Sequence, residues 1–144
     1  MVEFAQAYIE TSVVLRWTLG QPGAVQGVHW VSASSSELTP VETRRTLDCM
    51  RLAKTLSRRR LAELRDDADR NLARMNLVPL DQSVLKRAGE PFPTPLKTLD
   101  AIHLATALIL NDSIGGIVFL THDRQLGVAA KACGLAIYPD PIAP

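Results

Sequence analysis

Short apolar runs alternate with helical patterns along the whole chain, and this alternation most constrains the fold. Residues 117–121 (I-V-F-L-T) are continuous and apolar, which is typical of a central parallel strand. Strands that alternate with helices predict an α/β fold, in which helices cover both faces of a parallel sheet of four to five strands. The other predicted strands are residues 5–9, 28–33, 77–80 and 135–138, the last at an edge.

Helical segments are predicted between these strands. They span residues 13–19, about 38–55, 58–75, 81–88, 98–110 and 124–133. Thr11 and Ser12 offer hydroxyl caps for the first helix, and Ser57 offers one for the third. The serine run Ser34–Ser36 is expected to be a turn, and residues 89–95, with three prolines, a loop.

Composition limits the classes of function that the chain can perform. A length of 144 residues is one domain's worth. The net charge of +1 gives no global basic field, so any affinity for nucleic acid must come from a local patch. The aromatic fraction of 5% argues against a base-stacking platform for RNA.

The cysteines and the apolar segments indicate a cytoplasmic protein with no membrane partner. Cys49 and Cys133 stand outside any CxxC or Cys/His motif, so both are expected to be small buried hydrophobic residues on helices rather than zinc ligands. The N-terminal segment lacks the pattern of a signal peptide. The longest apolar stretch, residues 101–110, is interrupted by His103 and Thr106 and is too short for a membrane span.

Four acidic residues stand where one edge of such a sheet would bring them together. Glu10 directly follows the first predicted strand, and Asp123 follows residues 117–121. Glu42 lies on the helix that leaves the second strand, and Asp100 lies in the first turn of its helix. Sites in open parallel sheets form outside the carboxyl ends of the strands, so all four can reach one edge. Clustered carboxylates need a compensating cation, and Mg²⁺ and Mn²⁺ prefer such oxygen ligands.

Each acid also has a structural interpretation of its own. Residues 39–42 (T-P-V-E) fit a capping box with proline at the first helical position, so Glu42 could merely cap its helix. Asp100 would gain from the dipole at a helix start, and Asp123 could be an N-cap. The functional interpretation therefore rests on the four acids taken together.

The local sequences around these acids resemble the four motifs of PIN-domain nucleases. Residues 8–16 (Y-I-E-T-S-V-V-L-R) look like the opening motif, and residues 36–45 (S-E-L-T-P-V-E-T-R-R) like the second. Residues 98–107 (T-L-D-A-I-H-L-A-T-A) are close to the third, and residues 119–135 begin with the fourth (F-L-T-H-D-R-Q-L). The matches come in family order and span nearly the whole chain. Its size and helix pattern look like the VapC-type toxins of VapBC toxin–antitoxin pairs.

The resemblance implies a PIN-like three-layer α/β/α fold in a single domain over residues 1–144. It also implies a metal-dependent endoribonuclease that hydrolyses RNA phosphodiesters. The catalytic residues would be Glu10, Glu42, Asp100 and Asp123. The principal ligands of Mg²⁺ or Mn²⁺ would be Glu10, Asp100 and Asp123. A cluster of carboxylates that holds such a metal can catalyse phosphodiester hydrolysis.

The resemblance also implies partners. A toxin of this type would bind a small VapB-like antitoxin whose basic residue enters the acidic site, and we expect a homodimer. Helices near residues 11–20 and 38–55 are expected to form the groove for the antitoxin, because exposed helices suit helix-in-groove docking.

Side chains near the acids are expected to support them. Thr11, Ser12 and Thr121 can fix the carboxylates by hydrogen bonds, or can act as helix caps and turn formers. Residues that could contact phosphates flanking the scissile bond are Arg16, Arg44 and Arg45. Acids interleave with the arginines of residues 58–74, which favours a solvated helix face there. His103, one turn after Asp100, is expected to pack or to support the site, because Mg²⁺ prefers oxygen ligands.

One position departs from the family pattern. The family has aspartate where this chain has Glu10, which keeps the charge but extends the carboxylate by one methylene. Since Mg²⁺ demands near-ideal octahedral geometry, weaker activity or a preference for Mn²⁺ would follow. An alternative hypothesis is a PIN-fold binding or regulatory module with weak or lost nuclease activity. A receiver-like phosphoacceptor domain is also an α/β fold with clustered acids, but the order of acids and lysines in this chain does not match that class.

Overall fold

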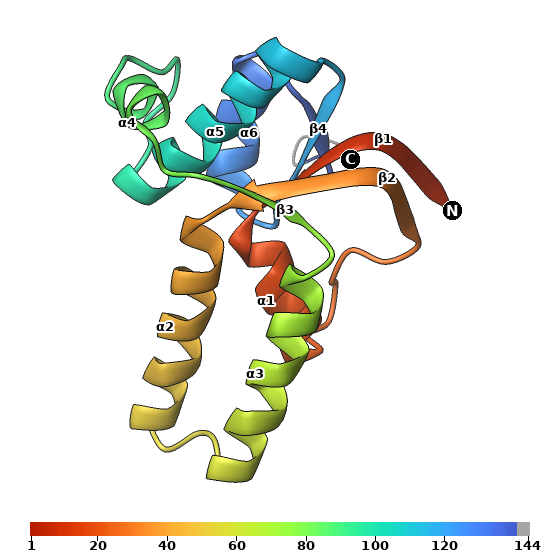
Figure 1. The fold of residues 1–144 in the computed structure, drawn as a ribbon, viewed down its shortest axis with the longest axis vertical. Helices are drawn as coiled ribbons and strands as arrows, with labels where there is room; N and C mark the ends of the chain where they lie inside the picture. Colours follow the sequence, from red (N-terminus) through yellow and green to blue (C-terminus); the bar gives the residue numbers. More distant parts are fainter. Residues whose placement is uncertain (141–144) are drawn as a thin grey trace.

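The strands form one parallel sheet. In the computed structural model, which describes residues 1–140, neighbouring strands pair in the order β3-β2-β1-β4-β5, and every pair is parallel (Figure 1). The strands are β1 Val2–Ile9, β2 Val28–Ser36, β3 Asn76–Val78, β4 Ile117–Leu120 and β5 Ala136–Tyr138. The predicted α/β fold with a parallel sheet is therefore confirmed. Residues 141–144 lie outside the described part of the chain.

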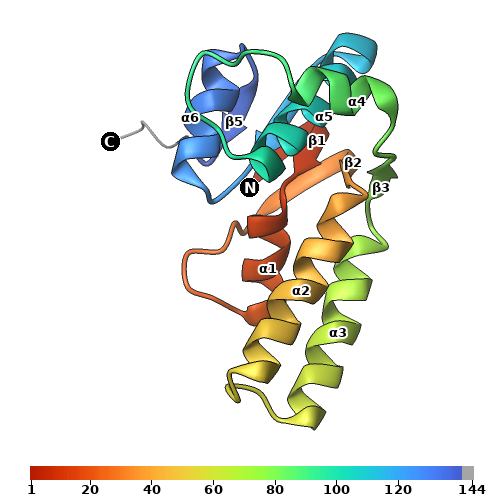
Figure 2. The ribbon, with the colours of Figure 1, turned by 90° about the vertical axis from the view of Figure 1, so that its left-hand side faces the viewer.

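Helices cover both faces of this sheet. They are α1 Thr11–Leu19, α2 Leu38–Leu52, α3 Arg58–Leu72, α4 Gln82–Ala88, α5 Thr98–Ile114 and α6 Arg124–Ala132. Figure 1 shows α5 and α6 on one side of the sheet and α1 on the other, while α2 and α3 extend side by side away from it (Figure 2). The three predicted layers are thus present.

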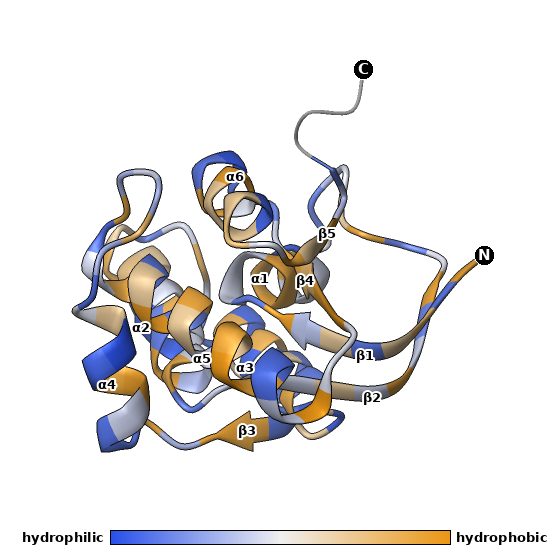
Figure 3. Cartoon of the chain, turned by 90° about the horizontal axis from the view of Figure 1, so that it is seen from above, coloured by the Kyte–Doolittle hydropathy of each residue, from blue (hydrophilic) through white to orange (hydrophobic). Residues whose placement is uncertain are grey.

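Side-chain alternation along the strands explains the layers. Ile9 points into a core with Val13 and Val14 of α1, whereas Tyr8, one residue earlier, points into a second core with Leu104 of α5. A third, smaller cluster joins α2 to α3. Hydrophilic and hydrophobic residues alternate around α4, of which only Val84 is buried (Figure 3). Within residues 1–140, no helix is both long and apolar enough to cross a membrane.

The order of the strands determines where a site can form. The chain runs from β1 to β2 and β3 on one side, then returns to place β4 on the other side of β1. The backbone NH of Glu10 donates to the carbonyl oxygen of Leu120 at 3.0 Å, so the ends of β1 and β4 meet. Ligand sites in open α/β sheets form at such a switch point, outside the carboxyl ends of the strands.

Several local predictions were wrong. Ser34–Ser36 continues β2 instead of turning, because these residues pair with β3 and the Ser35 hydroxyl donates to the Ile9 carbonyl oxygen at 2.6 Å. The helix predicted to reach residue 55 ends at Leu52, since Lys54 adopts a positive φ of 59°. Cys49 was expected to be buried but is exposed on α2.

Candidate active site

Glu10 is held at the junction of β1 and α1. Its side chain is the N-cap of α1 and accepts a hydrogen bond from the backbone NH of Ser12 at 3.1 Å. The same oxygen, Oε2, also accepts from the Ser12 and Thr121 hydroxyls, the latter at 2.9 Å. The carboxylate, rather than the predicted hydroxyls of Thr11 and Ser12, therefore caps the helix. Glu10 is only 5% exposed, so its charge lies at the base of the site.

Glu42 reaches the same region from α2. Its Oε1 accepts from the Thr11 hydroxyl at 2.7 Å and lies 2.5 Å from Nε2 of His103. The side chain of Glu42 is 22% exposed. At the start of α2, the Leu38 NH donates to the Ser36 hydroxyl instead, at 3.0 Å. Glu42 is therefore turned inward and does not cap its helix.

The role of His103 was the least well defined by the sequence. His103 is fully buried on α5, and its Nδ1 lies 2.8 Å from the Tyr8 hydroxyl. Its Nε2 lies 3.1 Å from the Thr11 hydroxyl as well as next to Glu42. The spacing of three residues from Asp100 was the only signal, because it places His103 one turn further along the same helix face.

The charges of the other three acids affect the pKa of Asp100. Asp100 lies in the first turn of α5 and is half-buried. Burial raises the pKa of its carboxyl, and the negative charges of Asp123, Glu10 and Glu42 raise it further, while His103 opposes them. Four carboxyls that stand far apart in the sequence thus share one electrostatic environment.

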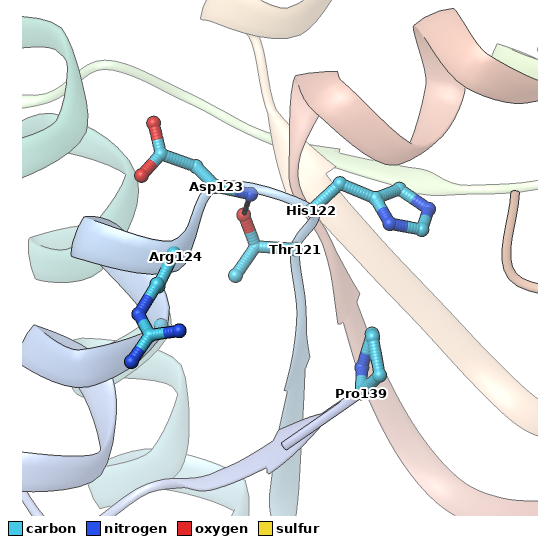
Figure 4. A pocket seen from close by; sticks show the side chains of 6 residues that line it. Thr121, His122, Asp123, Arg124 and Pro139 are labelled. Atoms are coloured by element: carbon cyan, nitrogen blue, oxygen red, sulfur yellow. Dashed lines mark hydrogen bonds between the residues drawn. The ribbon is translucent and has the colours of Figure 1, made fainter. Parts of the chain in front are cut away.

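The sequence allowed Asp123 to be a helix N-cap or an acid of the site, and its position is compatible with both. Asp123 follows β4, is exposed, and caps α6, since its Oδ1 accepts from the Leu126 NH at 2.9 Å. Its own NH donates to the Thr121 hydroxyl at 3.0 Å (Figure 4). Thr121 therefore links Asp123 to Glu10. An N-cap position leaves the outer carboxylate oxygen available to a ligand.

A cavity of about 250 Å³ opens beside Asp123. Arg124 and Pro139 are among its lining residues (Figure 4). His122 points away from Asp123 in this view, and its Nε2 accepts from the Val25 NH at 3.2 Å. Burial, together with the nearby charge of Arg16, lowers the pKa of His122.

The three arginines predicted to contact RNA have other partners in the structure. Arg16 donates to the Pro22 carbonyl oxygen at 3.3 Å. Arg44 pairs with Asp69, and Arg45 pairs with Asp48, both at 3.0 Å. Among the residues of α3, Arg59 and Arg60 pair with Glu63 in the same way, as expected for a solvated face.

The donor set fits a hard divalent cation in its chemistry. Within residues 1–140, hydrogen bonds occupy only Oε2 of Glu10 and only Oε1 of Glu42, so each keeps one oxygen for another ligand. Burial and then the charges of the other three acids raise the pKa of Asp100, and a cation would relieve the second of these effects. As the side chains lie, no three acidic, histidine or cysteine side chains in this part of the chain form a preformed metal cluster.

Comparison with known proteins assigns the family. The family model for the PIN domain matches residues 7–132. The chain belongs to the PIN-domain family. The match includes all four acids, and the relatives below carry the name VapC, which confirms the resemblance to VapC-type PIN nucleases.

Relatives of this PIN domain include two proteins named as ribonucleases from Mycobacterium tuberculosis. Ribonuclease VapC46 (strain ATCC 25618 / H37Rv) is 44% identical over 68 residues, 47% of this chain and 51% of the relative. Ribonuclease VapC47 (strain CDC 1551 / Oshkosh) is 27% identical over 127 residues, 88% of this chain and 91% of the relative. The chain thus spans about half the length of VapC46 but most of VapC47.

A solved structure shares the fold. The crystal structure of PAE2754 from Pyrobaculum aerophilum superposes with a TM-score of 0.57, over 92% of this chain and 83% of that chain. The sequence identity is 16%, so the likeness concerns the fold alone.

Proposed function

We propose that this protein is a Mg²⁺- or Mn²⁺-dependent endoribonuclease, the VapC-type toxin of a toxin–antitoxin pair, built as one PIN domain over its whole length. The observation that carries the proposal is the shared electrostatic environment of Glu10, Glu42, Asp100 and Asp123, expressed in the raised pKa of Asp100. Membership of the PIN family and the likeness to VapC ribonucleases support the choice of RNA as substrate.

Three of the acids would hold the ion. Glu10 has a free Oε1, and Asp100 and Asp123 lie at the starts of α5 and α6 with their carboxylates accessible. The bound ion would supply positive charge that offsets the carboxylates and the phosphodiester, and would activate the attacking water. Ser12 and Thr121 hold the Glu10 carboxylate in one orientation throughout.

The remaining acid would handle the proton. Glu42 keeps Oε2 free to accept a hydrogen bond from a water, while Thr11 and His103 restrain Oε1. In this arrangement Glu42 orients the water and takes its proton as general base. Arg124 lines the cavity beside Asp123 and is the arginine best placed to meet a flanking phosphate. Arg16, Arg44 and Arg45 would extend the RNA contact further from the site.

A cleavage assay on the purified full chain tests the proposal. With Mg²⁺ or Mn²⁺, we expect cleavage of single-stranded or structured RNA, and we expect EDTA to stop it. Asp100→Asn should abolish cleavage, whereas Asp112→Asn, an exposed aspartate on the same helix, should not. Metal-dependent cleavage that survives Asp100→Asn would remove Asp100 from the site. A wild-type protein that binds RNA without cleaving it would instead favour a PIN-fold binding module.

A VapB-like antitoxin and a homodimer complete the proposal. α2 carries two large exposed hydrophobic residues, Val41 and Leu52, which suit a surface that another helix covers. Co-expression with the product of a neighbouring reading frame should yield a complex that has lost ribonuclease activity. Sedimentation of the isolated chain tests the dimer.

A further inference from the structure

A chain of three polar side chains runs through the interior beneath the acidic site. Tyr8 of β1 and His103 of α5 are both fully buried, although 95 positions separate them, and the Tyr8 hydroxyl lies 2.8 Å from Nδ1 of His103. The opposite ring nitrogen, Nε2, lies 2.5 Å from Oε1 of Glu42. This series of hydrogen-bonded side chains therefore begins at Tyr8 in the hydrophobic core and ends at the Glu42 carboxylate, which is partly exposed to solvent.

The hydrogen-bond partners fix which ring nitrogen carries the proton. The Glu42 carboxylate only accepts hydrogen bonds. The Thr11 hydroxyl lies 2.7 Å from Glu42 and 3.3 Å from the Thr39 hydroxyl, so we assign its single proton to the shorter contact, with Glu42. Nε2 of His103 thus faces two acceptors and must be the donor. When Nε2 carries the only ring proton, Nδ1 accepts from the Tyr8 hydroxyl, which lies 2.8 Å away.

This arrangement does more than satisfy a buried ring. A glutamate side chain has several rotatable bonds, and fixing them costs entropy unless contacts hold them. Thr11 and His103 both donate to Oε1 of Glu42, which leaves Oε2 as the oxygen that can face the acidic site. A histidine with only a packing role would need partners, but not a partner that is itself part of the site.

We propose that His103, oriented by Tyr8, is a positioning residue that holds the Glu42 carboxylate in place for its role as general base. The inference rests on the proposed ribonuclease function, and it assigns to a buried imidazole a part that the four acids alone do not provide. His103 itself touches neither RNA nor metal in this scheme. Its effect passes entirely through Glu42.

The conservative variant is His103→Gln, because the glutamine side-chain NH₂ can occupy the place of Nε2–H. His103→Leu removes the donor and keeps an apolar side chain of moderate size. We expect His103→Leu to lower kcat by about 10–100-fold with little change in KM for RNA, as for other groups that orient residues of a metal site. His103→Gln should restore most of kcat. In a double-mutant cycle with Glu42→Gln, the two losses should not add.

A matched control separates positioning from stability. Leu64 of α3 is equally buried but lies in the separate cluster that joins α3 to α2. Leu64→Ala should lower the unfolding free energy, and the protein that remains folded, as measured by circular dichroism, should keep the wild-type kcat. If His103→Leu behaves like Leu64→Ala, or if its loss adds fully to that of Glu42→Gln, the proposal is overturned.

A second measurement does not depend on cleavage. The ¹⁵N chemical shifts of the His103 ring in the metal-free protein report its tautomer, and we expect Nε2–H in the wild type. A dominant Nδ1–H tautomer would overturn the positioning role whatever the enzyme activity. If the wild type cleaves no RNA with either metal, the ribonuclease proposal and the base role of Glu42 fail together. The tautomer then still decides whether His103 orients Glu42.

Discussion

Thr121→Val should loosen two of the four acids at once. The Thr121 hydroxyl donates to Oε2 of Glu10 at 2.9 Å and accepts from the Asp123 NH at 3.0 Å, and the residue is 4% exposed. Valine has nearly the same shape but no hydroxyl. The substitution therefore removes both hydrogen bonds without opening a cavity.

The expected cost follows from these two contacts. A hydrogen bond to a charged group contributes about 1.5–3 kcal/mol, and an unpaired buried NH costs about 1–3 kcal/mol. Asp123 is exposed, so water can replace part of the second contact. We therefore expect the free energy of unfolding to fall by about 2–4 kcal/mol. For a domain of this size, that lowers the melting temperature by about 6–12 °C. Affinity for Mn²⁺ should fall by about 10–100-fold.

Urea unfolding followed by circular dichroism measures the first quantity, and calorimetric titration of Mn²⁺ measures the second. Thr121→Ser is the matched control, because it keeps the hydroxyl and loses one methyl group, worth about 0.8 kcal/mol. An unfolding free energy for Thr121→Val within about 0.5 kcal/mol of the wild type, the range of neutral surface substitutions, together with unchanged Mn²⁺ affinity, would refute the reasoning.

The remaining predictions concern charge, ligand length and products. The folded state raises the pKa of Asp100, so its ionisation lowers stability as the pH rises above about 3.9, the unfolded value. Asp100→Asn should therefore raise the metal-free melting temperature at pH 7 and lose this advantage near pH 3; a pH-independent gain would contradict the argument. Glu10→Asp should tighten Mg²⁺ binding or speed cleavage by about 10–100-fold, and Glu10→Gln should weaken both. Glu3→Asp is the control. If neither Glu10 substitution changes Mg²⁺ binding or cleavage, Glu10 is not part of the site. In the proposed mechanism water, rather than the ribose 2′-hydroxyl, attacks the phosphorus, so products should carry 5′-phosphate ends. Finding 2′,3′-cyclic phosphates by mass spectrometry would rule this mechanism out.

The sequence predicted the sheet and most helices because local patterns determine them. Residues 117–121 were apolar enough to mark a central strand, and β4 occupies Ile117–Leu120 beside β1. The serines of β2 were wrongly predicted to form a turn, because a serine run usually indicates one. In the fold, the Ser35 hydroxyl bonds to the Ile9 carbonyl oxygen and lies 2.7 Å from the Thr39 hydroxyl. Polar side chains that bond to neighbouring strands are compatible with a buried strand.

The contacts that organise the acids could not be predicted in the same way. Glu42 and His103 stand 61 positions apart, and neither has a local pattern that names the other. Glu10 as an N-cap was also missed, because Ser, Thr, Asp and Asn are the residues usually favoured there. Once the strand order is known, both follow, since β1 lies between β2 and β4 and brings α1, α2 and α5 to one edge.

The distribution of ion pairs bears on what the acidic edge can bind. Within residues 1–140, each salt bridge of an arginine or lysine lies elsewhere, on α2, on α3 or between α6 and Asp140. Glu10 and Glu42 are held without an arginine or a lysine: hydroxyls and a backbone NH bind Glu10, and a hydroxyl and an imidazole bind Glu42. Hydroxyl and backbone NH donors fix the direction of a carboxylate but leave its charge uncompensated. The fold thus orients the carboxylates of Glu10, Glu42 and Asp123 and brings their negative charge near Asp100, so a divalent cation would gain both from the charge and from oxygens that are already oriented.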